Sequence, residues 1–207
     1  MNILLADDHE VVRRGLKQIL AEEFPDAVFG EAGTGPETLD RAREANWDLL
    51  VLDINMPGRS GLEVLAELKV RQPKLRVLVL SMSPEEEYAV RVLKRGAAGY
   101  LTKQAVATEL VGATRKIVAG GRYISVVAAE QLAASLGHAE NLHDQLSDRE
   151  LQVLRLLAVG RSVKEIAADL FLSEKTVFTY RDRLRTKRVL KSDVELARYA
   201  LQHHLVE

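Results

Sequence analysis

The chain has 207 residues, a formal net charge of −1 and no cysteine. The missing cysteines exclude disulfides, thiolate metal sites and thiol catalysis. No apolar run approaches the roughly 18 residues that a membrane span needs, and the first residues resemble a strand rather than a signal peptide. We therefore expect a cytoplasmic protein without a membrane partner, built as one large or two small domains.

Short apolar runs alternate with helical patterns through the first 120 residues. The predicted strands are Ile3–Asp7, Ala27–Ala32, Leu49–Asp53, Leu75–Ser81 and Ala98–Leu101, and the predicted helices lie near 10–21, 35–45, 61–70, 84–95 and 106–119. This alternation predicts an α/β fold, a parallel sheet with helices on both faces. Residues 49–52 are apolar without alternation, as expected when both faces of a sheet are covered.

Several predicted helices begin with a capping box, in which Ser or Thr is followed three residues later by Glu. The pairs are Thr34 with Glu37, Ser60 with Glu63, Ser83 with Glu86, Ser147 with Glu150 and Ser162 with Glu165. Pro84 takes the first helical position, where a missing N–H costs nothing. Ser173 is a further candidate N-cap.

The pattern changes after residue 121. Residues 122–143 are Ala-rich, partly helical and weakly charged, and we interpret them as an interdomain linker. From Ser147 the pattern is entirely helical, with helices expected near 148–159, 163–170, 174–187 and 192–204. About three residues around Phe171–Ser173 separate the second helix from the third, which is the connection length of a helix-turn-helix. The sequence therefore predicts two domains.

Polar side chains gather at the predicted strand ends of the first domain. Asp7 and Asp8 follow the first strand, Asp53 and Ser81 end the third and fourth, and Lys103 follows the fifth. Taken singly, each has a plain structural explanation as a helix cap or a surface residue. Together they lie where parallel sheets bind ligands. Three carboxylates repel one another without a cation, and oxygen ligands suit Mg²⁺. The natural nucleophile is a carboxylate that would form an aspartyl-phosphate.

These residues carry a family resemblance. Asp7-Asp8, Asp53-Ile54-Asn55-Met56-Pro57-Gly58, Ser81 and Gly96-Ala97-Ala98-Gly99-Tyr100-Leu101-Thr102-Lys103 resemble the signature set of two-component receiver domains. The resemblance covers residues 1–120, within a receiver domain of residues 1–121, and implies a flavodoxin-like, doubly wound sheet of five strands. It implies that Asp53 is the phosphorylation site. It also implies that Asp8, Asp53 and the backbone carbonyl of Asn55 ligate Mg²⁺, while Asp7 acts through water.

The same resemblance gives roles to three further residues. Ser81 is expected to hydrogen-bond the phosphoryl group, Lys103 to pair with it, and Tyr100 to serve as a rotating aromatic switch. We picture Tyr100 as a half-buried ring that turns into space opened when Ser81 moves. A simple packing role is the alternative for Tyr100.

The second domain resembles the LuxR-type helix-turn-helix over residues 147–190. The motifs are Leu146-Ser147-Asp148-Arg149-Glu150, Lys164-Glu165-Ile166-Ala167 and Leu172-Ser173-Glu174-Lys175-Thr176-Val177. With the receiver they identify the chain as a member of the NarL/FixJ class of transcription factors, with residues 144–207 as a small all-α DNA-binding domain of four helices. The class implies promoter DNA, a sensor histidine kinase and a homodimer formed on phosphorylation or DNA binding as partners, with RNA polymerase as a further candidate.

Residues 173–191 hold seven basic and two acidic side chains, which fits either a phosphate-facing stripe or a solvated helix face. Val177, Tyr180 and Leu184 are expected to face inward. The opposite stripe would face base edges, with Lys175 donating to guanine and the Thr179 methyl touching thymine. That stripe also carries Phe178 and Asp182, and the expected phosphate contacts are Lys164, Thr176, Arg181, Arg183, Arg185 and Lys187. Asp182 either accepts from cytosine or, as we favour, pairs with a neighbouring arginine.

Alternatives from other classes remain at this stage. The helical domain could bind a protein instead of DNA, although its basic third helix argues against this. An independent enzyme is disfavoured, because only self-catalysed phosphorylation and dephosphorylation of the receiver are expected. The last helix would form a dimer surface, an intradomain core, or both. Phosphorylation would either uncover the third helix or promote dimerisation.

Overall fold

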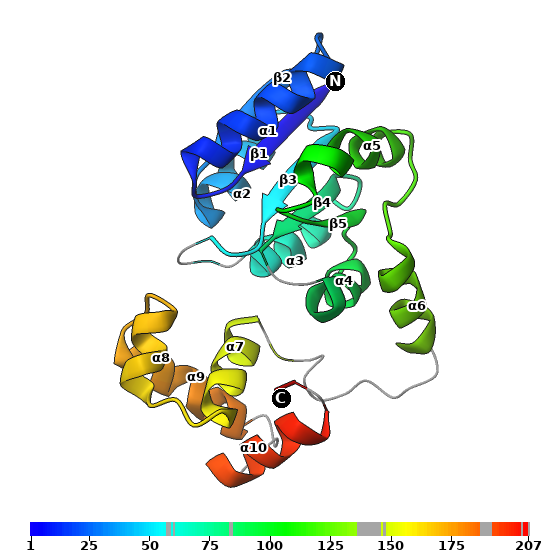
Figure 1. The fold of residues 1–207 in the computed structure, drawn as a ribbon. Helices are drawn as coiled ribbons and strands as arrows, with labels where there is room; N and C mark the ends of the chain where they lie inside the picture. The colour runs from blue at the N-terminus through cyan, green and yellow to red at the C-terminus, as the bar shows by residue number, and fades with distance from the viewer. Residues whose placement is uncertain are drawn as a thin grey trace. The chain divides into compact units, whose positions relative to one another are not determined.

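The computed structural model describes residues 1–56, 59, 61–82, 85–135, 146, 148–186, 192–203 and 205–206. The chain forms two compact units, Met1–His138 and Ala139–Glu207 (Figure 1). None of the helices described in either unit is long and apolar enough to cross a membrane.

The first unit is built on a parallel sheet. Its strands are β1 (Asn2–Ala6), β2 (Val28–Ala32), β3 (Leu49–Asp53), β4 (Arg76–Ser81) and β5 (Gly99–Thr102), and their order across the sheet is β2-β1-β3-β4-β5. Each strand lies within one or two residues of its predicted place, and all the pairings are parallel. The order is that of the flavodoxin-like doubly wound fold, so the predicted fold class is confirmed.

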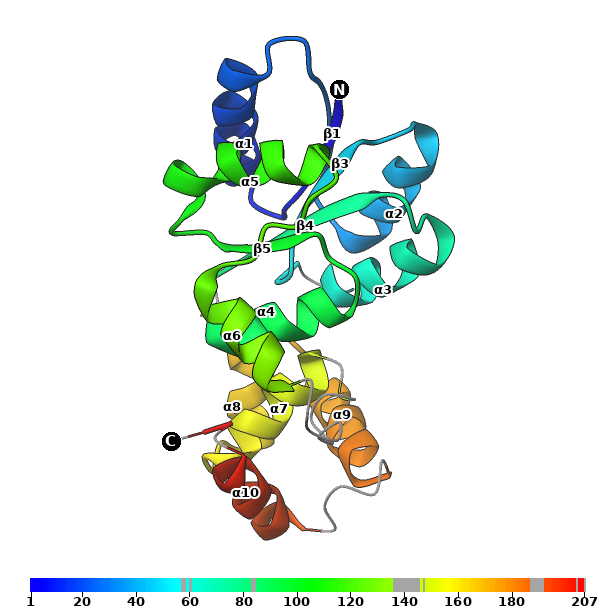
Figure 2. The ribbon, with the colours of Figure 1, turned by 90° about the vertical axis from the view of Figure 1, so that its right-hand side faces the viewer.

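Helices cover both faces of this sheet (Figure 2). They are α1 (Glu10–Glu23), α2 (Gly35–Glu44), α3 (Gly61–Arg71), α4 (Glu85–Lys94) and α5 (Val106–Val118). Ile3 and Leu5 of β1 pack with α1 and α5, whereas Leu4 and Ala6 pack with α2, α3 and α4. Successive side chains of a strand point to opposite faces, so each strand contributes to both core layers.

The segment after α5 also packs on the first unit. The Tyr123 N–H donates to the carbonyl of Ala98 at 2.8 Å, and Tyr123 bridges to Gly99 of β5. Helix α6 (Val126–Ser135) follows, packs against α4, and buries Ala128 in the core. Residues 126–135, which the sequence analysis assigns to the linker, therefore form a helix that belongs to the first compact unit.

Two of the predicted capping boxes can be compared with the structure. At Ser162 both halves form, because the Glu165 N–H donates to Ser162 Oγ at 3.3 Å and the Ser162 N–H donates to Glu165 Oε2 at 2.8 Å. At Thr34 the hydroxyl accepts from the Glu37 N–H, but the Glu37 carboxylate takes its bond from the N–H of Gly33. The boxes starting at Ser60, Ser83 and Ser147, and Pro84 with them, lie outside the described residues.

The second unit is helical. Its described helices are α7 (Asp148–Ala158), α8 (Val163–Asp169), α9 (Glu174–Thr186) and α10 (Asp193–Gln202), close to the predicted four. Leu154, Ile166, Val177, Leu184 and Leu196 form its buried core, with α7 against both α9 and α10. Val177 and Leu184 are buried and Tyr180 packs partly buried beside them, as expected of the inward stripe.

Two helix ends of this unit share one hydrogen-bond pattern. After α7 the N–H of Gly160 donates to Leu157 and that of Arg161 to Leu156, with Gly160 at φ +82°. After α8 the N–H of Phe171 donates to Ala168 and that of Leu172 to Ala167, with Phe171 at φ +53°. Both are Schellman motifs, which place one residue in the left-handed region. Phe171 therefore occupies a position that favours glycine.

Candidate phospho-acceptor pocket and DNA-binding helix

An acidic pocket lies at the carboxyl ends of the strands. Asp7 follows β1, Asp53 ends β3, Ser81 ends β4 and Lys103 follows β5, so four neighbouring strands bring these residues together. The side chains of Asp7 and Asp53 are each 1% exposed. The Lys103 ammonium lies 2.6 Å from Asp7 Oδ2 and 3.1 Å from Asp53 Oδ2. One cation thus holds two buried carboxylates.

The pocket shifts the pKa of both partners. Burial raises the pKa of the Asp53 carboxyl above its ordinary value, with Lys103 opposing the shift and Asp7 adding to it. The Asn55 N–H donates to Asp53 Oδ1 at 3.1 Å and also favours the ionised form. Burial alone would lower the pKa of Lys103, but the two carboxylates raise it above its usual range. Lys103 therefore carries a positive charge in this pocket.

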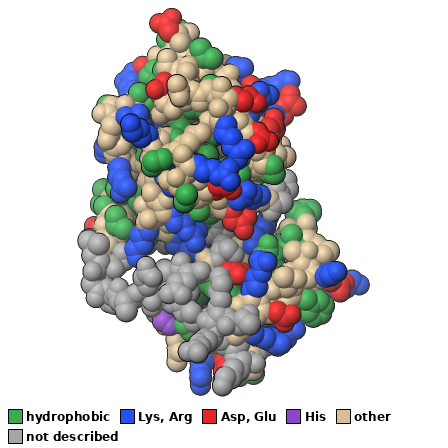
Figure 3. Space-filling model, turned by 180° about the vertical axis from the view of Figure 1, so that it is seen from behind, with side chains coloured by type: hydrophobic (Ala, Val, Ile, Leu, Met, Phe, Trp, Pro, Cys, Tyr) green, Lys and Arg blue, Asp and Glu red, His purple; other side chains and the backbone are tan. Residues whose placement is uncertain are grey.

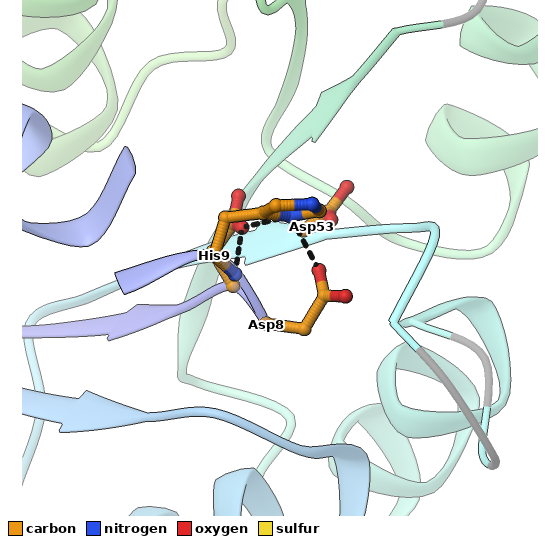
Figure 4. A group of neighbouring side chains, drawn as sticks. Asp8, His9 and Asp53 are labelled. Atoms are coloured by element: carbon orange, nitrogen blue, oxygen red, sulfur yellow. Dashed lines mark hydrogen bonds and ion pairs between the residues drawn. The ribbon is translucent and has the colours of Figure 1, made fainter. Parts of the chain in front are cut away.

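Asp8 and His9 form the outer edge of this pocket (Figure 4). His9 Nδ1 lies 2.9 Å from Asp8 Oδ1 and 3.3 Å from Asp7 Oδ1, with its ring largely exposed. One ligand atom from each of Asp7, Asp8, His9 and Asp53 falls within 4.8 Å of the others. Three carboxylates face a single ammonium, so this donor set suits a hard divalent cation that accepts oxygen ligands.

Two residues that the sequence analysis did not single out shape the pocket. Arg13 of α1 donates from Nη1 to the backbone carbonyl of Asp7 at 2.7 Å and from Nε to Glu31 at 3.3 Å. Gly61 lies so close to β3 that a Cβ there would meet the Asp53 carbonyl oxygen at 2.2 Å. Neither residue stands at a strand end or within the motifs that carry the receiver resemblance, so no sequence pattern pointed to them.

Ser81 and Tyr100 project from the same face of the sheet. Ser81 is paired with Thr102 and Val79 with Tyr100, and paired residues in a parallel sheet share a face. Ser81 is buried, and Tyr100 is 2% exposed. The half-buried ring expected from the sequence is therefore wrong for this structure, because Tyr100 packs in the core with Val79, Tyr88 and Ala128.

Helix α9 presents most of the residues proposed from the sequence as DNA contacts. Lys175, Phe178, Thr179, Asp182 and Arg183 are exposed along it, and Phe178 keeps 48% of its surface accessible. Thr176 and Arg181 are half-buried, Arg185 is exposed, and Lys164 is exposed on α8. Lys187 lies outside the described residues. The outward stripe therefore mixes cations with one large apolar side chain.

The start of α9 is fixed by Ser173. Its hydroxyl accepts from the Thr176 N–H at 3.1 Å and lies 2.8 Å from the Thr176 hydroxyl. One turn further along, Thr179 donates to the Lys175 carbonyl at 3.0 Å, and the Arg183 guanidinium lies over the Tyr180 ring at 5.7 Å. A shallow cavity of about 230 Å³ is lined by Lys175, Thr176, Thr179, Tyr180 and Arg183. The helix thus offers a preformed, positively charged groove.

Both units match known protein families. Residues 3–115 match the response regulator receiver domain, and residues 144–200 match the bacterial regulatory proteins of the luxR family. The chain therefore belongs to the two-component response regulators that join a receiver to a LuxR-type DNA-binding domain, the NarL/FixJ class. The expectation drawn from the sequence motifs is confirmed.

Particular relatives extend over the whole chain. The response regulator GacA of Pseudomonas aeruginosa is 40% identical over 100% of this chain and 98% of its own length. RcsB from Salmonella enterica serovar Typhimurium, bound to promoter rprA with the phosphomimetic BeF3−, is 28% identical with a TM-score of 0.60 over 96% of this chain and 97% of its own. A structure of two RcsB dimers on two parallel DNAs is 27% identical, with a TM-score of 0.61, over 96% of this chain and 97% of its own.

Proposed function

We propose that the chain is a transcription factor whose DNA binding is controlled by phosphorylation of Asp53. The observation that carries this is a buried carboxylate at the end of β3, held by the Lys103 ammonium beside the carboxylate of Asp7. The match to the receiver family supports it, and so does the similar structure of RcsB bound to promoter rprA in the presence of a phosphomimetic. Its phosphodonor is a sensor histidine kinase, and because DNA is a partner, the proposed place of action is the cytoplasm.

The pocket supplies a residue for each step of the phosphoryl transfer. A carboxylate oxygen of Asp53 attacks phosphorus, and the P–O bond forms as the bond to the donor breaks. Lys103 favours the ionised carboxylate before the step and pairs with a phosphoryl oxygen after it. Ser81 supplies a hydroxyl donor at the neighbouring strand end. The receiver also catalyses its own dephosphorylation, and no other enzymatic activity is proposed.

A magnesium ion fits the donor set of this pocket. Asp8, Asp53 and the backbone carbonyl of Asn55 would hold it, with Asp7 acting through water. When bound, it offsets the negative charge of the phosphoryl oxygens. The excess of three carboxylates over one ammonium supports this assignment, because without a cation that excess is repulsive.

The proposed switch connects the pocket to Tyr100. A phosphoryl group adds roughly −1.5 to −2 charge and three strong acceptors. Ser81 would move toward these acceptors, and because Ser81 and Tyr100 share a face of the sheet, Tyr100 and α4 would repack. The phosphorylated protein would bind DNA as a homodimer. Phosphorylation would either uncover α9 or promote dimerisation, and the exposed Val194 and Leu201 of α10 offer a surface for a dimer.

The exposed face of α9 is the proposed reader of double-stranded promoter DNA. Lys175, Phe178, Thr179 and Asp182 would face base edges in the major groove, where Lys175 donates to guanine. The proposed phosphate contacts are Lys164, Thr176, Arg181, Arg183, Arg185 and Lys187. They fix the register of the helix and contribute affinity without sequence information. RNA polymerase is a further proposed partner at the promoter.

Selection of binding sites from random duplex DNA tests this function. Full-length protein is used with and without beryllofluoride plus Mg²⁺, with Asp53→Asn as the acceptor variant and the exposed Asp26→Asn as the matched control. We expect a two-fold symmetric motif to be enriched by the treated wild type and control, but not by Asp53→Asn. Equal enrichment by all proteins would refute phosphorylation control. No enrichment at low salt would refute DNA binding and favour a protein partner.

A further inference from the structure

A second cavity lies at the end of the sheet opposite the acidic pocket. It has a volume of about 350 Å³ and is bordered by the end of α2, the loop into β3, and the segment between α3 and β4. Arg76, which lines it, is paired with Leu49 at the start of β3, whereas Asp53 ends that strand. At about 3.3 Å per residue, the two sites are roughly 13 Å apart along β3.

The walls of this cavity are fixed by hydrogen bonds. Trp47 donates from Nε1 to the carbonyl of Arg41, and Gln72 donates from Nε2 to the carbonyl of Ala42, both at 2.8 Å. The indole also rests on Gly30, where a Cβ would lie 2.3 Å from Cη2 of Trp47. The aromatic wall is thus held in place, and two carbonyl acceptors near the rim are already occupied.

The polar side chains left at the rim are predominantly cationic. Arg43, Lys74 and Arg76 line the cavity, and none of the described residues that line it is acidic, but the Arg43 guanidinium already pairs with Asp40 at 3.4 Å and with Glu67 at 3.8 Å. Within the described part of the chain, Lys74 and Arg76 have no acidic group within 4.0 Å, whereas Arg71 nearby is paired with Glu67 at 2.9 Å. Acidic and basic side chains are interspersed on the face shown in Figure 3. Lys74 and Arg76, unpaired among the described residues, make this concave site favourable for an anion.

We propose that this cavity binds a small organic phosphate that carries a planar ring. Lys74 and Arg76 supply charged donors for phosphate oxygens. Trp47 supplies an aromatic wall for the ring. The volume lies within the range of about 300–1,000 Å³ that is usual for small-molecule sites. The inference does not depend on phosphorylation of Asp53, since it uses other residues at the other end of the sheet.

Trp47 makes the site directly observable, because it is the chain's single tryptophan. In ¹H–¹⁵N correlation spectra of the full chain, its indole N–H gives one identifiable signal. We expect adenosine monophosphate to shift this signal saturably. Inorganic phosphate is expected to compete, and adenosine alone to bind more weakly. A saturable shift by adenosine equal to that of the nucleotide would overturn the role of the cations.

The double variant Lys74→Gln/Arg76→Gln tests the charged rim. Loss of two charge-assisted contacts is expected to weaken nucleotide binding by about tenfold or more. The double variant Arg14→Gln/Lys116→Gln removes the same charge from exposed positions on α1 and α5 and is expected to bind as the wild type does. Equal weakening in both variants, or no saturable shift in the wild type, would overturn the proposal.

Discussion

Replacing Phe171 with glycine is expected to stabilise the DNA-binding unit. Phe171 lies two residues after the end of α8, at φ +53°, in a motif whose counterpart after α7 carries Gly160 at φ +82°. Its side chain is 94% exposed, so the phenyl ring contributes little buried surface. The backbone of this turn sets the start of α9, and the substitution leaves all its hydrogen bonds possible.

Two opposing terms determine the size of the effect. A left-handed conformation costs an L-residue about 1–2 kcal/mol. Glycine avoids that cost, but it loses more backbone entropy on folding, which lowers the stability by about 0.5–1 kcal/mol relative to other residues. The free energy of unfolding of Phe171→Gly should therefore rise by about 0.5–1 kcal/mol. For a unit of this size, 1 kcal/mol corresponds to roughly 4–8 °C in Tm.

The measurement is urea unfolding of the full chain, followed by NMR signals of amides in α7 and α9. Phe171→Ala keeps the backbone cost and removes the ring, so we expect it to leave the free energy of unfolding nearly unchanged. Gly160→Ala is the reciprocal control: a Cβ there meets nothing within 4 Å, and only its backbone conformation is affected. It should destabilise the unit by about 1 kcal/mol.

The ranking of these variants by free energy of unfolding shows whether the left-handed backbone at Phe171 is costly. Stability should rise for Phe171→Gly, remain unchanged for Phe171→Ala and fall for Gly160→Ala. If Phe171→Gly and Phe171→Ala both destabilise the unit, the phenyl ring makes packing contacts that outweigh the backbone cost. The left-handed argument would then be refuted for this turn.

Further predictions concern the receiver. Thr114 is buried, and its hydroxyl finds no hydrogen-bond partner among the described residues, so Thr114→Val should raise the free energy of unfolding by about 1 kcal/mol in urea titrations. Lys103→Met leaves two buried carboxylates without their cation and should lower the free energy of unfolding by about 3–5 kcal/mol without Mg²⁺. Adding Asp53→Asn should partly reverse this loss in thermal unfolding. Gly61→Ala should lower the free energy of unfolding by about 2–3 kcal/mol, because its Cβ would overlap the Asp53 carbonyl. As a control, a Cβ at Gly112 inside α5 meets nothing within 4 Å, so Gly112→Ala should raise the free energy of unfolding by roughly 0.5–1 kcal/mol. An unchanged melting temperature for Gly61→Ala would contradict the close approach of Gly61 to β3.

The sequence was most informative where a local pattern has one structural solution. The uniformly apolar residues 49–52 predicted a strand covered on both faces, and all four are buried. Because parallel strands end at one edge, the positions of Asp7, Asp53 and Lys103 along the chain were enough to predict that they meet. Ser162 and Glu165, three residues apart, likewise gave a complete capping box.

Long-range packing was the part that no local pattern contained. The stretch around Ala128 has an Ala-rich composition that suits a linker, yet it buries that residue against α4. The burial of Tyr100 depends on Ala128 of α6 and on Tyr88 of α4, which come from separate parts of the chain. Arg13 contacts Asp7 through a backbone carbonyl, an acceptor present at every residue and therefore without a sequence signal.

Lys103 connects the charge in the pocket to the strands of the proposed switch. Its ammonium lies between Asp7 and Asp53, while its backbone N–H donates to the Ser81 carbonyl at 2.7 Å. A phosphoryl group on Asp53 would compete with Asp7 for the ammonium, because it brings more negative charge than the carboxylate it replaces. A shift of Lys103 would then act on the ends of β4 and β5 together, through a backbone bond that no side-chain substitution at Ser81 removes. For this reason Ser81→Ala and Lys103→Met should each weaken the coupling between Asp53 and Tyr100 without abolishing it. The beryllofluoride-induced shift of the Tyr100 ring signals measures both, and complete loss in Ser81→Ala would show that the hydroxyl alone carries the coupling.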